Sequence, residues 1–212
     1  MTSQYERELR HVLAGIPAGV EAVIKSCSVE EKERMRLVLL RPFLVVRAAG
    51  SGIEGSGDLL ALRGDLSFPI EVKTTKSRKI YLSGRTLDQY NALVYEGERC
   101  GLMPLYAHRL KGVRGDSWRI FRVETSTLEG RLSVLARRIP ALPRTRKGRA
   151  FIDWDQGMPL NAFINIVCQH NQHSPTLEYI QKRSVVEKED DEVTAVKSRI
   201  LDELQRRRTI LR

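Results

Sequence analysis

Residues 57–73 read GDLLALRGDLSFPIEVK, and this stretch decides the fold class. Two largely apolar runs, 58–62 and 68–74, flank three turn-forming residues, Arg-Gly-Asp at 63–65. Runs of this length on either side of a short glycine-containing turn are typical of a β-hairpin. We therefore expect two neighbouring antiparallel strands here.

The polar residues of this hairpin fall into a pattern. Side chains alternate between the two faces of a strand, so Glu71 and Lys73 are expected to share one face while Ile70 lies on the other. Asp58 opens the neighbouring strand, directly after a loop at 49–57 in which every second or third residue is glycine. Two carboxylates and one ammonium are thus predicted to converge at one edge of a sheet, where the glycines let a ligand approach the backbone.

This combination suits phosphodiester hydrolysis. Two carboxylates suit Mg²⁺, which keeps some of its waters and accepts phosphate oxygens as further ligands. The ammonium of Lys73 would orient the attacking water or offset charge on the phosphorus centre. A Glu-x-Lys pair alone is more often a solvated hairpin face, but Asp58 and the glycine loop favour a site.

The rest of the first 124 residues alternates helical and β patterns. Capping-box spacings occur at Ser3/Glu6, Ser28/Glu31 and Thr86/Gln89. The expected helices begin at these caps, with a further short one at 20–27, and the expected strands are 43–48, 58–62, 68–74, 102–108 and 118–123. This order predicts an α/β core over residues 3–123.

The charge of the chain points to a polyanionic partner. Lys and Arg number 36 against 26 acidic residues, a formal charge of +10, which favours nucleic acid first and an anionic membrane surface second. A basic protein without such a partner is the alternative. No apolar run approaches the ~20 residues of a membrane span, and three scattered cysteines imply no disulfide framework. We therefore expect a cytoplasmic protein with no membrane partner.

A basic segment follows the second strand of the hairpin. Tyr81 is surrounded by four cations, Lys76, Arg78, Lys79 and Arg85. A basic loop beside a metal site can track a phosphate backbone, so DNA contact is favoured over a merely solvated loop.

Four blocks of the sequence resemble the archaeal Holliday junction resolvases of the PD-(D/E)XK nuclease superfamily. They are Glu6-Arg7-Glu8-Leu9, then 45–51 (VVRAAGS), then Asp58, then 70–76 (IEVKTTK), with weaker support from Tyr81, Pro104 and 118–120. The resemblance covers roughly residues 3–123. It implies a restriction-endonuclease-like core with a central mixed β-sheet flanked by helices.

The resemblance also implies roles for individual residues. Asp58, Glu71 and the Val72 carbonyl would hold Mg²⁺, for which Mn²⁺ would substitute, and Lys73 would be the catalytic lysine. Glu6 would complete the acidic cluster, although its capping-box position offers the alternative of a simple cap for Ser3.

The remaining implications concern DNA and assembly. Arg7, Arg47 and Ser51 would contact phosphates. Family members are homodimers that nick opposing strands of a four-way junction. For the dimer interface, the helix after the hairpin offers Tyr90, Leu93, Val94 and Tyr95, and a C-terminal amphipathic helix with Ile200 and Leu204 competes with it.

Three segments depart from the family pattern: a helical insertion at 16–41, a longer loop at 53–56 before Asp58, and a C-terminal extension at 125–212. We therefore predict a nuclease core at 1–124 and an extension of unknown role. In the extension, Arg144, Arg146, Lys147 and Arg149 are expected either to hold DNA or to form a solvated basic linker. Cys168, His170 and His173 resemble part of a zinc site, but a fourth ligand is missing and a polar loop is the favoured interpretation.

The predicted function is Mg²⁺-dependent endonucleolytic cleavage of branched DNA, with resolution of Holliday junctions by paired nicks. A related nuclease acting on flaps or nicked duplex is the first alternative, and a non-catalytic DNA-binding protein on a nuclease fold is the second. Asp58, Glu71 and Lys73 together argue against the second. A nucleoid-associated protein of archaeal or viral source is the expected setting.

Overall fold

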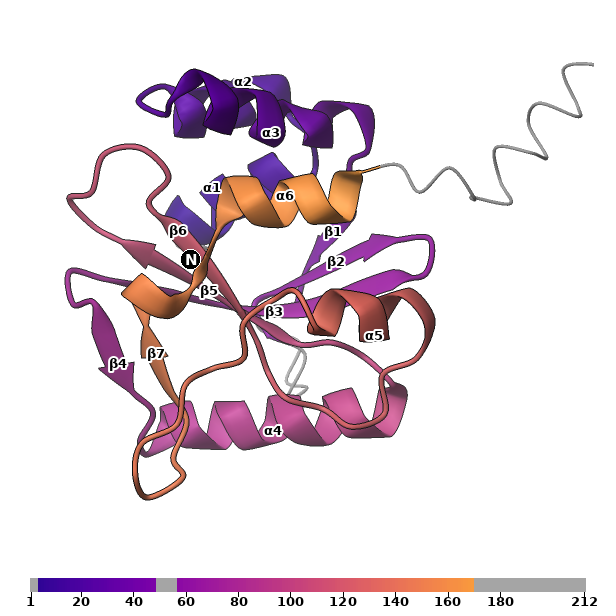
Figure 1. The fold of residues 1–212 in the computed structure, drawn as a ribbon, viewed down its shortest axis with the longest axis vertical. Coiled ribbons are helices and arrows are strands. Elements are labelled where there is room, and N and C mark those ends of the chain that lie inside the picture. The colour runs from indigo at the N-terminus through magenta and orange to yellow at the C-terminus, as the bar shows by residue number, and fades with distance from the viewer. Residues whose placement is uncertain (1–3, 49–56, 170–212) are drawn as a thin grey trace, which may run out of the picture. The chain divides into compact units, whose positions relative to one another are not determined.

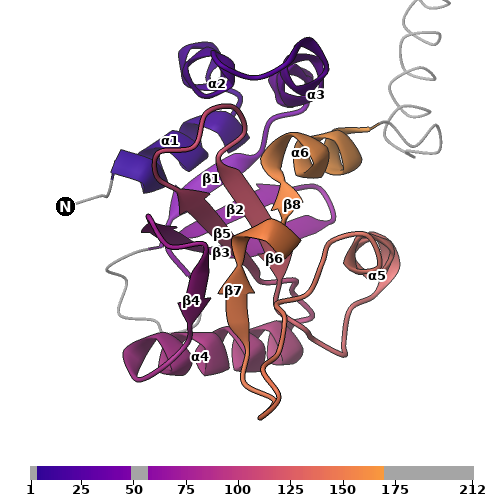
Figure 2. The ribbon, with the colours of Figure 1, turned by 60° about the vertical axis from the view of Figure 1, so that its left-hand side comes forward.

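A computed structural model describes residues 4–48 and 57–169 of the 212-residue chain. Its centre is a six-stranded sheet in the order β1-β2-β3-β5-β6-β8 (Figures 1 and 2, with β8 labelled in Figure 2). The strands are β1 (Leu44–Arg47), β2 (Leu59–Arg63), β3 (Leu66–Thr75), β5 (Leu105–Leu110), β6 (Trp118–Arg122) and β8 (Met158–Pro159). A separate two-stranded sheet pairs β4 (Lys79–Tyr81) with β7 (Phe151–Asp153).

The predicted hairpin is confirmed. β2 and β3 are antiparallel, with Leu59 opposite Ile70 and Arg63 opposite Leu66. β3 then pairs in parallel with β5, which requires a crossover connection, here made by β4 and helix α4 (Arg85–Cys100). The sheet is therefore mixed, as expected.

The two faces of the sheet carry separate cores. Figure 1 shows α4 across one face, and α1 (Gln4–Leu13) and α6 (Leu160–Cys168) on the other. On the α1/α6 face, Phe68 and Ile70 of β3 are buried with Phe163 of α6. On the α4 face, Tyr106 and Leu93 belong to the second core. Glu71 and Lys73 alternate with Ile70 on β3, so they lie on the α4 face.

The segment 16–41, predicted to be helical, is helical in the structure. It forms α2 (Pro17–Ile24) and α3 (Val29–Leu40). Ser28 caps α3 through a complete capping box, because its hydroxyl accepts from the Glu31 amide while the Glu31 carboxylate accepts from the Ser28 amide. Ser3 lies outside the described residues, so the Ser3/Glu6 box stays a prediction.

The predicted capping box at Thr86/Gln89 is wrong. Helix α4 begins one residue before Thr86, and its N-cap is Gly84 without a side-chain cap. Thr86 instead bonds back to Ser83, whose amide donates to the Thr86 hydroxyl over 2.9 Å. Gln89 therefore does not cap α4.

The extension predicted from residue 125 contributes to the same compact unit as the core. This unit runs from Met1 to Gln169. It includes α5 (Gly130–Ala136), a single 3₁₀ turn η1 (Trp154–Gln156), β7, β8 and α6. β8 extends the main sheet by pairing with β6, and α6 packs extensively on α3. The 124/125 division is therefore not a boundary in the packing.

Helices long and apolar enough to cross a membrane do not occur among the described residues. The segment from residue 170 onward, which holds His170, His173, Ile200 and Leu204, lies outside the described part of the chain.

Candidate active site

Asp58 is held against β3 by its backbone and its side chain. The Asp58 amide donates to the Ile70 carbonyl over 2.8 Å, and the Val72 amide donates to Asp58 Oδ2 over 2.8 Å. Gly57 makes this approach feasible: its φ is +70°, and a Cβ there would lie 2.7 Å from the Ile70 carbonyl oxygen. A residue with a side chain would push Asp58 off the strand.

Glu71 and Lys73 form an ion pair on the α4 face of β3. Lys73 Nζ lies 2.7 Å from Glu71 Oε1, and the side chains are only 17% and 6% exposed. Lys73 Nζ also donates to Gln89 Oε1 of α4 over 3.0 Å. The predicted convergence of Glu71 and Lys73 is confirmed. Gln89 is a site residue that sequence reasoning missed, because its spacing from Thr86 had suggested a helix cap.

The electrostatics of Asp58 reflect a crowded acidic site. Burial raises the pKa of Asp58 to about 6, and repulsion from Glu71 and then Glu6 adds to the effect, while the Val72 amide and Lys73 oppose it. A carboxyl group whose charge is disfavoured in this way gains from a nearby cation.

The acidic residues fit Mg²⁺ as a pair rather than as a triad. Within residues 4–48 and 57–169, no group of three or more His, Cys, Asp or Glu side chains is placed to hold a metal ion. Glu6 affects the pKa of Asp58 and lies 3.9 Å from Arg47 Nε. Two carboxylates are sufficient for Mg²⁺, which commonly keeps several waters. The metal-binding roles of Asp58, Glu71, Glu6 and the Val72 carbonyl stay predictions.

Tyr106 on β5 is a neighbour of the candidate site, because it lies opposite Glu71 in the β3–β5 register. Its side chain is fully buried. Burial raises the pKa of its hydroxyl, and the nearby Glu71, Tyr90 and Asp58 raise it further. Tyr106 is therefore a neutral hydroxyl beside the acidic pair at any ordinary pH.

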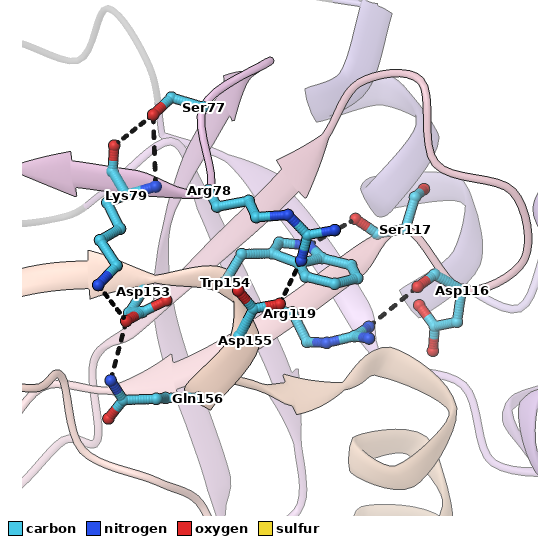
Figure 3. Close-up of polar contacts among 10 residues, drawn as sticks. All are labelled: Ser77, Arg78, Lys79, Asp116, Ser117, Arg119, Asp153, Trp154, Asp155 and Gln156. Atoms are coloured by element: carbon cyan, nitrogen blue, oxygen red, sulfur yellow. Dashed lines mark hydrogen bonds and ion pairs between the residues drawn. The ribbon is translucent and has the colours of Figure 1, made fainter.

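Two of the four cations in the basic segment after the hairpin are paired with carboxylates within the chain. Figure 3 shows Arg78 ion-paired with Asp155, and Lys79 with Asp153 over 3.3 Å. The Arg78 guanidinium also lies over the Trp154 ring, 5.3 Å from its centroid. These residues join β4 to the β7–η1 segment, a partnership that no local sequence pattern indicates.

The other predicted contacts lie on the surface. Arg7, Arg47, Lys76 and Arg85 are exposed, and of these Arg47 pairs with Glu6. Ser51 lies outside the described residues. The DNA-binding roles of all these residues stay predictions.

Most of the residues predicted on α4 to form a dimer interface are buried in, or packed against, the core of the protomer. Tyr90 and Leu93 are 8% and 1% exposed, and Val94 packs against the same core. Of the four, only Tyr95 is well exposed, at 64%. The homodimer itself stays a prediction. The predicted interface of Leu93 and Val94, flanked by Tyr90 and Tyr95, is wrong for Leu93 and Tyr90, because both are buried in the core of the protomer.

Cys168 ends α6 as a buried residue. Its sulfur accepts a hydrogen bond from Arg63 Nη1 over 3.3 Å. His170 and His173 lie outside the described residues, so the partial zinc pattern stays without a structural test.

The model of the family described as "Archaeal holliday junction resolvase (hjc)" matches residues 25–171. A solved structure of Archaeoglobus fulgidus Hjc, a Holliday junction resolvase from an archaeal hyperthermophile, is 23% identical, with 66% of this chain and 97% of that chain covered and a TM-score of 0.41. No curated protein matches the chain.

The matched range corrects the extent of the resemblance. It starts after α1, so Glu6 and Arg7 fall outside it, and it continues past residue 125 through the whole of α6. Residues 125–169 are thus part of the family's own fold rather than an unrelated addition. With well over half of its length matched by the family model, the chain belongs to the archaeal Holliday junction resolvase family.

Proposed function

We propose that this protein resolves four-way DNA junctions by Mg²⁺-dependent hydrolysis, with Asp58, Glu71 and Lys73 at the cleavage site. Family membership supports a nuclease of branched DNA. The observation that carries the assignment is the buried Glu71–Lys73 pair, 2.7 Å apart, beside an Asp58 whose pKa is raised to about 6. A protein that only binds DNA gains nothing from this costly arrangement.

The metal would be held by Asp58 and Glu71, with the Val72 carbonyl as the further oxygen that the resemblance implies, while the Glu6 carboxylate would act from α1 as an added negative charge beside Asp58. Mg²⁺ in such a site supplies Lewis acidity toward the phosphate and lowers the pKa of a bound water. Manganese has similar ligand preferences and is expected to substitute.

The chain's own residues orient the reacting groups. The Val72 amide donates to Asp58 Oδ2, so the other carboxylate oxygen of Asp58 is the one that would bind the metal. Lys73 has three N–H donors, of which Glu71 and Gln89 take two. Among the described contacts, one donor is left for a phosphate oxygen or the attacking water. In-line attack by a water molecule forms the new P–O bond as the P–O3′ bond breaks, and the attacking water gives up a proton to solvent. The products are a 5′-phosphate and a 3′-hydroxyl, whose oxygen takes up a proton from solvent.

Paired nicking requires two sites related by the approximate two-fold symmetry of the junction, which a C₂ dimer would supply. A cruciform plasmid tests this, because coordinated nicks yield linear DNA while independent nicks accumulate open circles. Light scattering tests the dimer directly. A monomer that yields open circles alone would refute paired nicking while leaving the nuclease chemistry intact.

The substrate is tested with labelled four-way junction, flap and linear duplex, each with and without Mg²⁺. We expect Mg²⁺-dependent cleavage of the junction above the other two. Asp58→Asn, Glu71→Gln and Lys73→Ala should each abolish cleavage and keep DNA binding, since phosphate contacts elsewhere supply affinity. Full activity in any of these variants would refute the site, and preferred cleavage of flaps would refute the substrate.

A further inference from the structure

A short basic hairpin precedes β7. Arg144 and Ala150 form its base, the Thr145 amide donates to the Arg149 carbonyl over 2.8 Å, and the Gly148 amide closes the turn onto the Thr145 carbonyl. Arg144 anchors it, with its guanidinium 2.9 Å from Glu124 and 3.1 Å from the Gly148 carbonyl. The segment is thus an ordered turn rather than a loose basic linker.

The hairpin carries positive charge that the described residues do not neutralise. Arg146, Lys147 and Arg149 are exposed, and none of the ion pairs found among residues 4–48 and 57–169 involves them. In this they differ from Arg78 and Lys79, which are paired with carboxylates. Cations without an internal partner are the ones free to contact phosphate.

A pocket of about 310 Å³ lies between the hairpin and the end of β4. Tyr81, Leu82 and Ser83 line one side, and the hairpin, including its three free cations, lines the other. Figures 1 and 2 show the loop before β7 at the end of the β4–β7 pair that is nearer α4. The pocket therefore combines an aromatic wall with a cationic rim.

Tyr81, which lines this pocket, carries an aromatic ring that is held in place by a second ring. Its ring stacks on Phe151 of β7, with centroids 5.4 Å apart and planes 21° from parallel. It is nevertheless 62% exposed. An exposed ring already held in place by a second ring loses little freedom when a base stacks on it.

We propose that this nucleotide pocket, lined by Tyr81–Ser83 and Thr145–Ala150, binds one unpaired nucleotide of the DNA substrate. The Tyr81 ring would take the base, and Arg146, Lys147 and Arg149 would take the flanking phosphates. Aromatic stacking is available only to a base that has left the double helix, while the cations serve any strand. The pocket would therefore help to distinguish a branch point from continuous duplex. This inference rests on the proposed function.

Binding in EDTA, measured by anisotropy with a labelled four-way junction and with a linear duplex of the same arm sequence, tests the pocket apart from cleavage. Tyr81→Ala should weaken junction binding about 5- to 150-fold, the range for loss of one base–aromatic stack, and leave duplex binding unchanged. Tyr81→Phe keeps the ring and should bind as the parent does. Unchanged duplex affinity also shows that Tyr81→Ala is folded.

The cationic rim is tested against an equal loss of charge elsewhere. The double variant Arg146→Ala/Lys147→Ala should flatten the negative slope of log K against log salt, reducing its magnitude by about 2, since each phosphate contact contributes about 0.9. Arg137→Ala/Arg138→Ala removes two exposed charges just beyond α5 and should change it little. The proposed nucleotide pocket would be overturned if the two double variants changed the salt dependence of binding equally. It would also be overturned if Tyr81→Ala lost the same affinity for the junction as for the duplex. Failure of the parent protein to bind junctions would instead overturn the proposed function.

Discussion

Replacing Asp58 with asparagine should stabilise the metal-free protein while abolishing cleavage. The folded protein raises the pKa of this carboxyl from 3.8 to about 6, so its ionisation works against folding. A shift of about two units corresponds to at most ~3 kcal/mol. The side chain is only partly buried, and solvent screening reduces this to about 1–2 kcal/mol. Asparagine keeps an oxygen that can accept from the Val72 amide, so that contact need not be lost.

The gain should depend on pH with a definite sign. Below pH 3.8, the carboxyl is protonated in both the folded and the unfolded chain, and the variant should match the parent. Between pH 3.8 and about 6, the unfolded chain ionises this carboxyl while the folded parent keeps its proton, so the parent loses stability relative to the variant; above about 6 both states carry the charge and the loss stops growing. The advantage of Asp58→Asn should therefore appear between pH 4 and 6 and stay constant above.

Thermal melts in EDTA measure this directly. A gain of 1–2 kcal/mol corresponds to a rise in Tm of about 2–8 °C for a protein of this size. Asp65→Asn, at an exposed turn carboxylate 62% accessible at its side chain, serves as the control and should not show the same pH-dependent gain. Added Mg²⁺ should raise the Tm of the parent but not of Asp58→Asn. A variant that is destabilised, or whose gain is the same at pH 4 and pH 8, would refute the reasoning.

Three further predictions follow from the same contacts. Lys73→Ala should lower stability by about 1–3 kcal/mol in denaturant titrations, because the 4%-exposed Glu71 loses its charged partner; unchanged stability would contradict the ion pair. Gln89→Ala should slow single-turnover cleavage about 10- to 100-fold with junction affinity in EDTA unchanged, as expected for a residue that orients Lys73; an equal loss of affinity would make it a DNA contact instead. Lys76→Ala should lower the salt slope of binding by about 0.9 and Arg78→Ala by clearly less, because Asp155 already pairs with Arg78; equal slopes would show that this ion pair opens on DNA.

The part of the site on the β2–β3 hairpin could be predicted because its determinants are local. Strand alternation places Glu71 and Lys73 together whatever the rest of the chain does, and a short turn fixes the register of the hairpin. Asp58 needs only one more element, a glycine that lets the chain cross over Ile70. The same local logic predicted α3, whose capping box is complete within four residues.

The parts that could not be predicted depend on contacts between distant segments. Gln89 reaches Lys73 only because α4 packs across the sheet, and its capping-box spacing suggested a local role. Asp153 and Asp155 neutralise Lys79 and Arg78 across 74 and 77 positions respectively, through a strand pairing with no sequence signature. Leu93 and Tyr90 gave an apolar stripe, and periodicity alone cannot distinguish a stripe that meets the sheet from one that meets a second subunit.

Glu6 on helix α1 is a residue for which the family match and the structure give different information. The family match starts after this helix, so membership alone assigns Glu6 no role. The structure nevertheless packs α1 against β1, β2 and β3 and brings the Glu6 carboxylate close enough to raise the pKa of Asp58. Glu6 is a third acidic group, and its charge adds to the repulsion at Asp58, so a bound cation would be stabilised further. Because Glu6 is not part of a three-ligand cluster, coordination positions on Mg²⁺ would remain for water and phosphate. We therefore infer that α1 tunes the metal affinity of the site rather than completing its ligand set, and Glu6→Gln should weaken Mg²⁺ activation while leaving the maximal cleavage rate at saturating Mg²⁺ near that of the parent.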